Sequence, residues 1–253
     1  MHTTTLLCIA RIGALTGHNA SVRLGRLSGV TRYASVGKGG QPLSLLVRYN
    51  ALVDSEELRS EISTTHLQNL AEIFVKYNVH ERLRVHLIHG HVKVAADNVM
   101  LGHSFTEPSD VHGHIFKLVD GGHFVAYEYV EGKASDLSDI STDFFKDLVE
   151  YLKSHQLEAT VGLQILGQSA RNIAEFDFGD CGTVMLKEQD IYYATPFRTV
   201  GWVFTCKEGF ASFKGNETHM ETVKGTHKVL IDIKLALNIT ALKAILKRFK
   251  VVN

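Results

Sequence analysis

The chain has 253 residues, of which 45% are hydrophobic and 21% charged, and its 27 basic and 27 acidic side chains give a formal net charge of zero. This length can bury one sizeable core or two small ones, and the balanced charge excludes an overall field that would attract nucleic acid or acidic lipid. Three widely separated cysteines argue against a disulfide framework and predict an intracellular, cytoplasmic protein, and no apolar run reaches the roughly 18 residues of a transmembrane helix.

The beginning of the chain differs from the rest in charge. Residues 1–53 contain no Asp or Glu, but they carry six basic side chains: Arg11, Arg23, Arg26, Arg32, Lys38 and Arg48. A basic leader without acids is typical of a mitochondrial transit peptide, and a disordered tail or a mispredicted start are the alternatives. We therefore predict a leader over residues 1–48, followed by one globular domain over residues 49–233.

Two amphipathic helices are expected in the globular domain. The first follows a cap in Ser63–Gln68, where Thr65 and Gln68 have capping-box spacing, and it ends at Asn78. The second begins after Ser141, which is a natural N-cap. Each predicted helix has an apolar stripe at helical spacing: Leu67, Leu70, Phe74 and Tyr77 in the first, and Phe145, Leu148, Val149 and Leu152 in the second.

A histidine-rich stretch lies between these helices. Residues 83–94 are aliphatic and β-branched with a period of two, which predicts a strand. On such a strand His89 and His91 share a face with Val85 and Leu87, and His86 lies on the other face. A second strand is expected over residues 98–105.

A hairpin follows, because Asp120-Gly121-Gly122 separates two apolar runs, residues 113–119 and 123–130, and these residue types accept tight hairpin turns. Its first arm is preceded by a second H-x-H pair, His112 and His114. The side chains of Phe116, Tyr127 and Tyr129 could line a pocket for a small-molecule ligand, although aromatic stripes also form cores.

The two H-x-H pairs suggest a metal site. If their strands are neighbours, the imidazoles of His89, His91, His112 and His114 converge, and such a set suits a divalent transition metal such as zinc, copper, nickel or iron. Cupin-like barrels use H-x-H on a strand in this way, but the flanking glycine and glutamate of that family are missing here. The alternative is that these histidines bond to backbone carbonyls or lie on the surface.

The second half of the domain reads as short strands over residues 159–166, 175–178, 183–186 and 199–205. The polar stretch from Gly215 to His227 is expected to be a loop. Residues 234–253 form a predicted final helix, with an apolar stripe that includes Leu242 and Leu246 and a basic opposite face.

The segment Lys76-Tyr-Asn-Val-His-Glu-Arg82, followed by His86-Leu-Ile-His-Gly-His91, resembles uncharacterised small proteins of filamentous ascomycete fungi. Those proteins have a helix that ends near K-Y and then a strand similar to L-L-H-x-H-F. Gly90 and Val92 depart from that pattern, and the resemblance brings no activity with it.

The order of elements predicts an α+β fold with a largely antiparallel sheet and helices packed on one side. Three functions are open: an intracellular metal-binding protein or metal-dependent enzyme, a cofactor-free small-molecule-binding or accessory protein, and an interaction module that uses its basic C-terminal helix. No motif assigns a catalytic residue.

Overall fold

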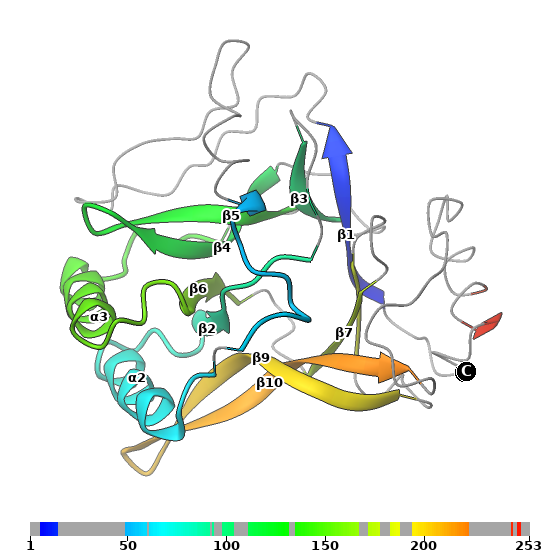
Figure 1. The fold of residues 1–253 in the computed structure, drawn as a ribbon. Coiled ribbons are helices and arrows are strands. Elements are labelled where there is room, and N and C mark those ends of the chain that lie inside the picture. The colour runs from blue at the N-terminus through cyan, green and yellow to red at the C-terminus, as the bar shows by residue number, and fades with distance from the viewer. Residues whose placement is uncertain are drawn as a thin grey trace.

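The computed structural model contains two helices and ten strands among the residues that it describes (Figure 1). The described residues are 6–14, 49–59, 61–91, 93, 98–103, 111–131, 135–166, 172–177, 183–187, 194–222, 244 and 247–248. The helices are α2 (Thr64–Lys76) and α3 (Thr142–Ser154). The strands are β1 (Leu6–Ala14), β2 (Leu83–Leu87), β3 (Asn98–His103), β4 (Val111–Val119), β5 (His123–Glu131), β6 (Val161–Ile165), β7 (Ile173–Asp177), β8 (Thr183–Lys187), β9 (Ala194–Lys207) and β10 (Phe210–Thr222).

The strands form one sheet that closes on itself in the order β1-β3-β5-β4-β6-β2-β9-β10-β7-β8, with β8 pairing back to β1. Eight neighbouring pairs are antiparallel. Two pairs, β3 with β5 and β7 with β10, are parallel. The predicted α+β class is therefore confirmed, while the curled sheet is mixed because two of its pairs are parallel.

Both predicted helices are present, and Figure 1 shows them on the same side of the sheet. The cap of α2 is Ser63, whose Oγ accepts a hydrogen bond from the backbone N–H of His66. The predicted capping-box spacing placed this cap two residues too late. Phe74 of α2 and Phe144 of α3 pack edge to face with ring centroids 5.1 Å apart, so the two helices share one apolar layer with the sheet.

Strand β2 shows how the sheet separates apolar from polar side chains. All five of its residues are buried, and Leu83, Val85 and Leu87 join the apolar core cluster beneath the helices. Side chains alternate between the faces of a strand, so Arg84 and His86 point away from the helices, into the interior of the curled sheet. The apolar core thus lies outside the closed sheet, and a polar cluster lies within it.

The structure differs from the sequence-based predictions for three strands. Strand β2 ends at Leu87, well before residue 94. Residues 210–222, which include part of the polar stretch expected to be a loop, form strand β10. Within the predicted leader, residues 6–14 form β1, which pairs with β3 and β8; the division into leader and domain stays a prediction.

The hairpin of β4 and β5 is confirmed, with Gly121 and Gly122 both at positive φ. The predicted C-terminal helix over residues 234–253 falls outside the described residues except at positions 244, 247 and 248. Among the described helices, none is long and apolar enough to cross a membrane.

Candidate metal centre

The first H-x-H pair lies just beyond the end of β2. The side chains of His89 and His91 are buried in the interior, where the His89 ring stacks on His86 with centroids 5.2 Å apart and meets His91 edge to face at 4.7 Å. The prediction that His86 lies on the opposite face from His89 and His91 is therefore wrong. The physical reason is that β2 ends at Leu87. Side chains no longer alternate beyond that residue, so the rings of His89 and His91 can both turn into the interior.

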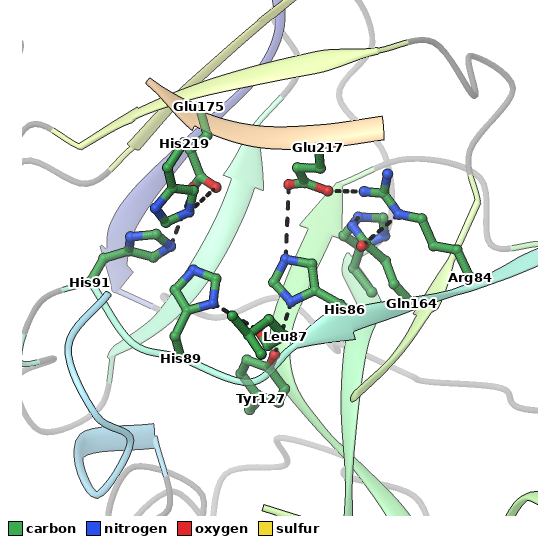
Figure 2. A network of polar contacts seen from close by, with 11 residues as sticks. Arg84, His86, Leu87, His89, His91, Tyr127, Gln164, Glu175, Glu217 and His219 are labelled. Carbon is green, nitrogen blue, oxygen red and sulfur yellow. Dashed lines mark hydrogen bonds and ion pairs between the residues drawn. The ribbon is translucent and has the colours of Figure 1, made fainter. Parts of the chain in front are cut away.

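Two further side chains reach the same place from the parallel pair β7 and β10. Glu175 of β7 and His219 of β10 are register partners. His219 Nε2 lies 2.9 Å from Glu175 Oε2, and His91 Nε2 lies 3.3 Å from Glu175 Oε1. One carboxylate therefore contacts two imidazoles that come from different parts of the chain, as Figure 2 shows.

His89, His91, Glu175 and His219 together form a group that could hold a metal ion. All four side chains are buried, and their ligand atoms lie within 4.8 Å of one another. Metal–ligand bonds of roughly 2.0–2.2 Å place neighbouring tetrahedral ligands about 3.4 Å apart and opposite octahedral ligands about 4.2 Å apart. A modest contraction of the group would therefore bring all four donors into bonding range.

The hydrogen bonding of His89 prepares it to be a ligand. Its Nδ1 lies 2.7 Å from the backbone oxygen of Leu87, and because a carbonyl can only accept, Nδ1 carries the proton. The lone pair is then on Nε2, which is buried and has no hydrogen-bond partner among the described residues. A ligating histidine commonly has this outer hydrogen bond, which fixes its tautomer and ring orientation.

The electrostatics of the group favour neutral His89 and ionised Glu175. Burial, followed by the neighbouring His91 and His219, lowers the pKa of His89 well below its ordinary value. Burial alone would raise the pKa of Glu175, but His91 and His219 hold it well below its usual range. Neutral imidazole and ionised carboxylate are the forms that bind metals, so His89 and Glu175 are ready to bind. Burial alone would lower the pKa of His91, but Glu175 and Glu128 raise it, so a metal ion would replace a proton there.

The interior contains several buried acids. Among the described residues, the buried side chains include four acids and one guanidinium: Glu128, Glu175, Asp177, Glu217 and Arg84. Burial raises the pKa of Glu128 to about 8, so it is mostly neutral at pH 7. Glu217 pairs with Arg84, while Glu175 lies against the imidazoles of His91 and His219. Because a buried carboxylate needs a partner, a divalent cation in the group would compensate the charge of Glu175.

A second polar network lies beside the group. The Arg84 guanidinium pairs with Glu217 and donates from Nε to Gln164 Oε1 at 2.7 Å, and Gln164 Nε2 donates to His114 Nε2 at 2.9 Å. Gly201 leaves room for the ion pair, because a Cβ there would lie 2.8 Å from Glu217 Cβ. Arg84 and Glu217 are thereby fixed next to the four-residue group.

His86 connects the two networks. Its ring stacks on His89, its Nε2 lies 4.0 Å from Glu217 Oε1, and its Nδ1 lies 3.4 Å from the Tyr127 hydroxyl. Burial, and then Arg84, lowers the pKa of His86 well below its ordinary value. Neutral His86, phenolic Tyr127 and protonated Glu128 therefore surround the group with side chains that can donate or accept protons.

The structure unites only part of the predicted metal set. His89 and His91 belong to the group, whereas the group contains neither His112 nor His114, and His114 contacts Gln164 instead. Glu175 and His219 were not predicted as ligands, because no local motif marks them. The one available signal is the pair Glu217 and His219, which has the i, i+2 spacing that puts both on one face of a strand.

The residues of the predicted ligand pocket divide between the two sides of the sheet. Phe116 belongs to the apolar cluster beneath the helices, and the Tyr127 hydroxyl contacts His86 in the interior. Tyr129 is buried, which raises the pKa of its hydroxyl to about 12. A pocket that joins all three aromatic rings stays a prediction.

The chain matches no protein-family model, no curated protein and no solved structure.

Proposed function

We propose that this chain is a metal-dependent enzyme that holds one divalent transition metal at His89, His91, Glu175 and His219. The observation that carries the proposal is the convergence of four buried donor side chains within 4.8 Å, one of which, His89, has its tautomer fixed with Nε2 as the lone-pair donor. The resemblance to fungal proteins stays a prediction and adds no activity.

The donor set narrows the identity of the metal. Three imidazoles and one carboxylate without a thiolate suit zinc, iron(II), nickel and copper(II) better than calcium or magnesium, which take oxygen ligands, or copper(I), which favours sulfur. With four protein ligands, tetrahedral zinc would have no open position. An ion that prefers six ligands would keep two positions for substrate or water.

Catalysis explains the surroundings of the group better than a structural role does. Structural zinc sites are mostly built from cysteine thiolates, and this group has none. It is instead bordered by His86, whose ring stacks on His89 and whose Nδ1 lies 3.4 Å from the Tyr127 hydroxyl. The buried Glu128 interacts electrostatically with His91. The bound ion would polarise a substrate or a water molecule, and these side chains would hold or accept the protons that such a reaction moves.

The test is the metal content of the purified full-length chain, measured by elemental mass spectrometry after expression in medium that contains the first-row transition metals. We expect near-stoichiometric metal in the wild type and a loss of it in His89→Gln. The matched control is His114→Gln, which removes a histidine that is hydrogen-bonded in the same interior but lies outside the group, and which we expect to retain metal.

Two outcomes would overturn the proposal. The first is a wild type that contains no metal and takes up none on addition; protons on His91 and His219 would then offset the buried negative charge in place of a metal ion. Metal loss in His114→Gln equal to that in His89→Gln would show that the ion depends on the fold of the interior and not on the four ligands.

A further inference from the structure

The proposed metal centre has two halves that are held differently. Glu175 and His219 lie on β7 and β10, which are paired within the sheet. His89 and His91 lie on residues 88–91, a short arm that follows β2 and belongs to no strand of the sheet. On the sheet side the arm is tied by the Ile88 N–H, which donates to the Thr160 carbonyl at 2.8 Å.

A second segment, residues 49–59, fixes the arm at its centre, and we call this segment the strap. The Gly90 N–H donates to the Val53 carbonyl, and the Ser55 N–H donates to the Gly90 carbonyl, both at 2.8 Å. These bonds form a parallel bridge between Asp54 and Gly90. Both backbone polar groups of the residue between the two histidine ligands are therefore satisfied by the strap.

The strap also reaches His91 directly. The Tyr49 hydroxyl accepts a hydrogen bond from the His91 N–H at 3.4 Å, and the Tyr49 ring packs 6.5 Å from that of Tyr127 on β5. In Figure 1 the strap is the light-blue segment that runs from beside β5 to the beginning of α2. It joins the arm to elements on both sides of the interior.

Arg198 of β9 holds the strap in place. Its Nη1 donates to the backbone carbonyls of Ser55, at 3.3 Å, and Leu58. Arg198 is also the cross-strand partner of His219 on β10. Arg198 thus ties the strand pair β9–β10, which carries His219, to the strap, which contacts the arm with His89 and His91.

We infer that Arg198 is a positioning residue that, through the strap, keeps His89 and His91 in ligating geometry and so sets how slowly the metal leaves. The inference rests on the proposed metal site. Release of two of the four ligands requires movement of the arm, and the arm is bonded to the strap through Gly90 and Tyr49. Because coupling is reciprocal, bound metal must also hold the strap in place.

Gly90 gives a second way to disturb the same contact. A Cβ at this position would lie 3.3 Å from Leu52 Cβ of the strap, so Gly90→Ala would press the arm and the strap apart while leaving all four ligands present. The φ of Gly90 is not among the positive values, so an alanine would not be strained by its own backbone.

The experiment measures the rate at which zinc leaves the full-length protein into an excess of a chromophoric chelator. We expect Arg198→Met to release zinc about tenfold faster than the wild type or more, since hydrogen bonds from a charged donor are among the stronger ones. Arg198→Lys should restore part of the slow release. Gly90→Ala should also release zinc faster, which keeps the inference testable if Arg198→Met does not fold.

The matched control is Arg82→Met, because Arg82 likewise donates to a backbone carbonyl, that of Asp136, but precedes β2 at the end opposite the arm. Hydrogen exchange supplies a second readout: the amides of residues 49–59 should exchange more slowly with zinc than without it.

Equal release rates in the wild type, Arg198→Met and Gly90→Ala would overturn the inference while the metal site stands. Equally fast release in Arg82→Met would also overturn it, by showing a general loss of stability. A wild type that retains no zinc or other metal would overturn the proposed function, and this inference with it.

Discussion

His219 and Glu175 face each other across a parallel strand pair, with Nε2 of the imidazole 2.9 Å from Oε2 of the carboxylate. The same carboxylate lies 3.3 Å from His91 Nε2 through its other oxygen. Glu175 is therefore the member of the metal group that contacts imidazoles from two separate segments, and it supplies the group's one negative charge.

Glu175→Gln should weaken metal binding most directly, because it keeps the size of the side chain but removes its charge. Loss of an outer-shell partner already lowers metal affinity roughly 10–100-fold, so loss of a ligand charge should exceed that range. Competition with a chelator of known affinity would measure it. Glu221→Gln, on the same strand as His219, is the control, and equal affinities in the two variants would contradict the assignment.

The helices and the hairpin could be predicted because their signals are local. Ser141 caps α3 by accepting a hydrogen bond from the Asp143 N–H, and Asp120-Gly-Gly encodes the β4–β5 turn through positive φ at both glycines. Such signals act within a few residues of the chain, so neither depends on where the rest of the sheet goes.

Only two of the four ligands in the metal group could be predicted from the sequence, and the reason is physical. The H-x-H pair indicated His89 and His91, but Glu175 and His219 join them through the pairing of β7 with β10, which no short pattern encodes. The polar residues from Gly215 to His227 predict a loop, because polar side chains usually lie in solvent, whereas Glu217 and His219 of β10 are buried. The Glu208-Gly209 turn, with both residues at positive φ, was the available hairpin signal.

Removal of the metal should lower thermal stability. A ligand that binds only the folded state stabilises it by about 2.7 kcal/mol at a free concentration of 100 times its Kd, and about 1 kcal/mol changes the Tm of a protein near this size by roughly 2–4 °C. We therefore expect the Tm to fall by about 5–10 °C when the metal is chelated, as measured by calorimetry. In His89→Gln the same chelator should leave the Tm nearly unchanged; an equal fall in that variant would point to an effect of the chelator elsewhere.

The stability should also depend on His114 at acidic pH. Burial, then Arg84 and His112, lowers the pKa of His114 to about 3, below the ordinary value of about 6.5 that applies in the unfolded chain. Between these values the unfolded state binds more protons, so stability falls as the pH drops from about 6.5 towards about 3. The slope for one group is at most about 1.4 kcal/mol per pH unit.

His114→Gln should remove this contribution, because glutamine keeps an acceptor for Gln164 Nε2 but does not titrate. We expect urea unfolding at pH 5 and pH 7 to show a stability difference that is about 1–2 kcal/mol smaller in the variant than in the wild type. An unchanged difference would mean that His114 is protonated as easily in the folded protein as in the unfolded chain.

Removal of one partner of the buried ion pair between Arg84 and Glu217 should destabilise the protein more than removal of both. Both side chains are almost fully buried, so Arg84→Met would leave the Glu217 charge without its partner and destabilise the protein by about 3–5 kcal/mol. Arg84→Met combined with Glu217→Leu removes both charges and should recover at least half of that loss. Urea unfolding of the metal-free single and double variants measures the coupling between the two residues. If the loss in the double variant equals the sum of the losses in the two single variants, the pair has no coupling, and the Glu217 charge is stabilised by other groups of the interior.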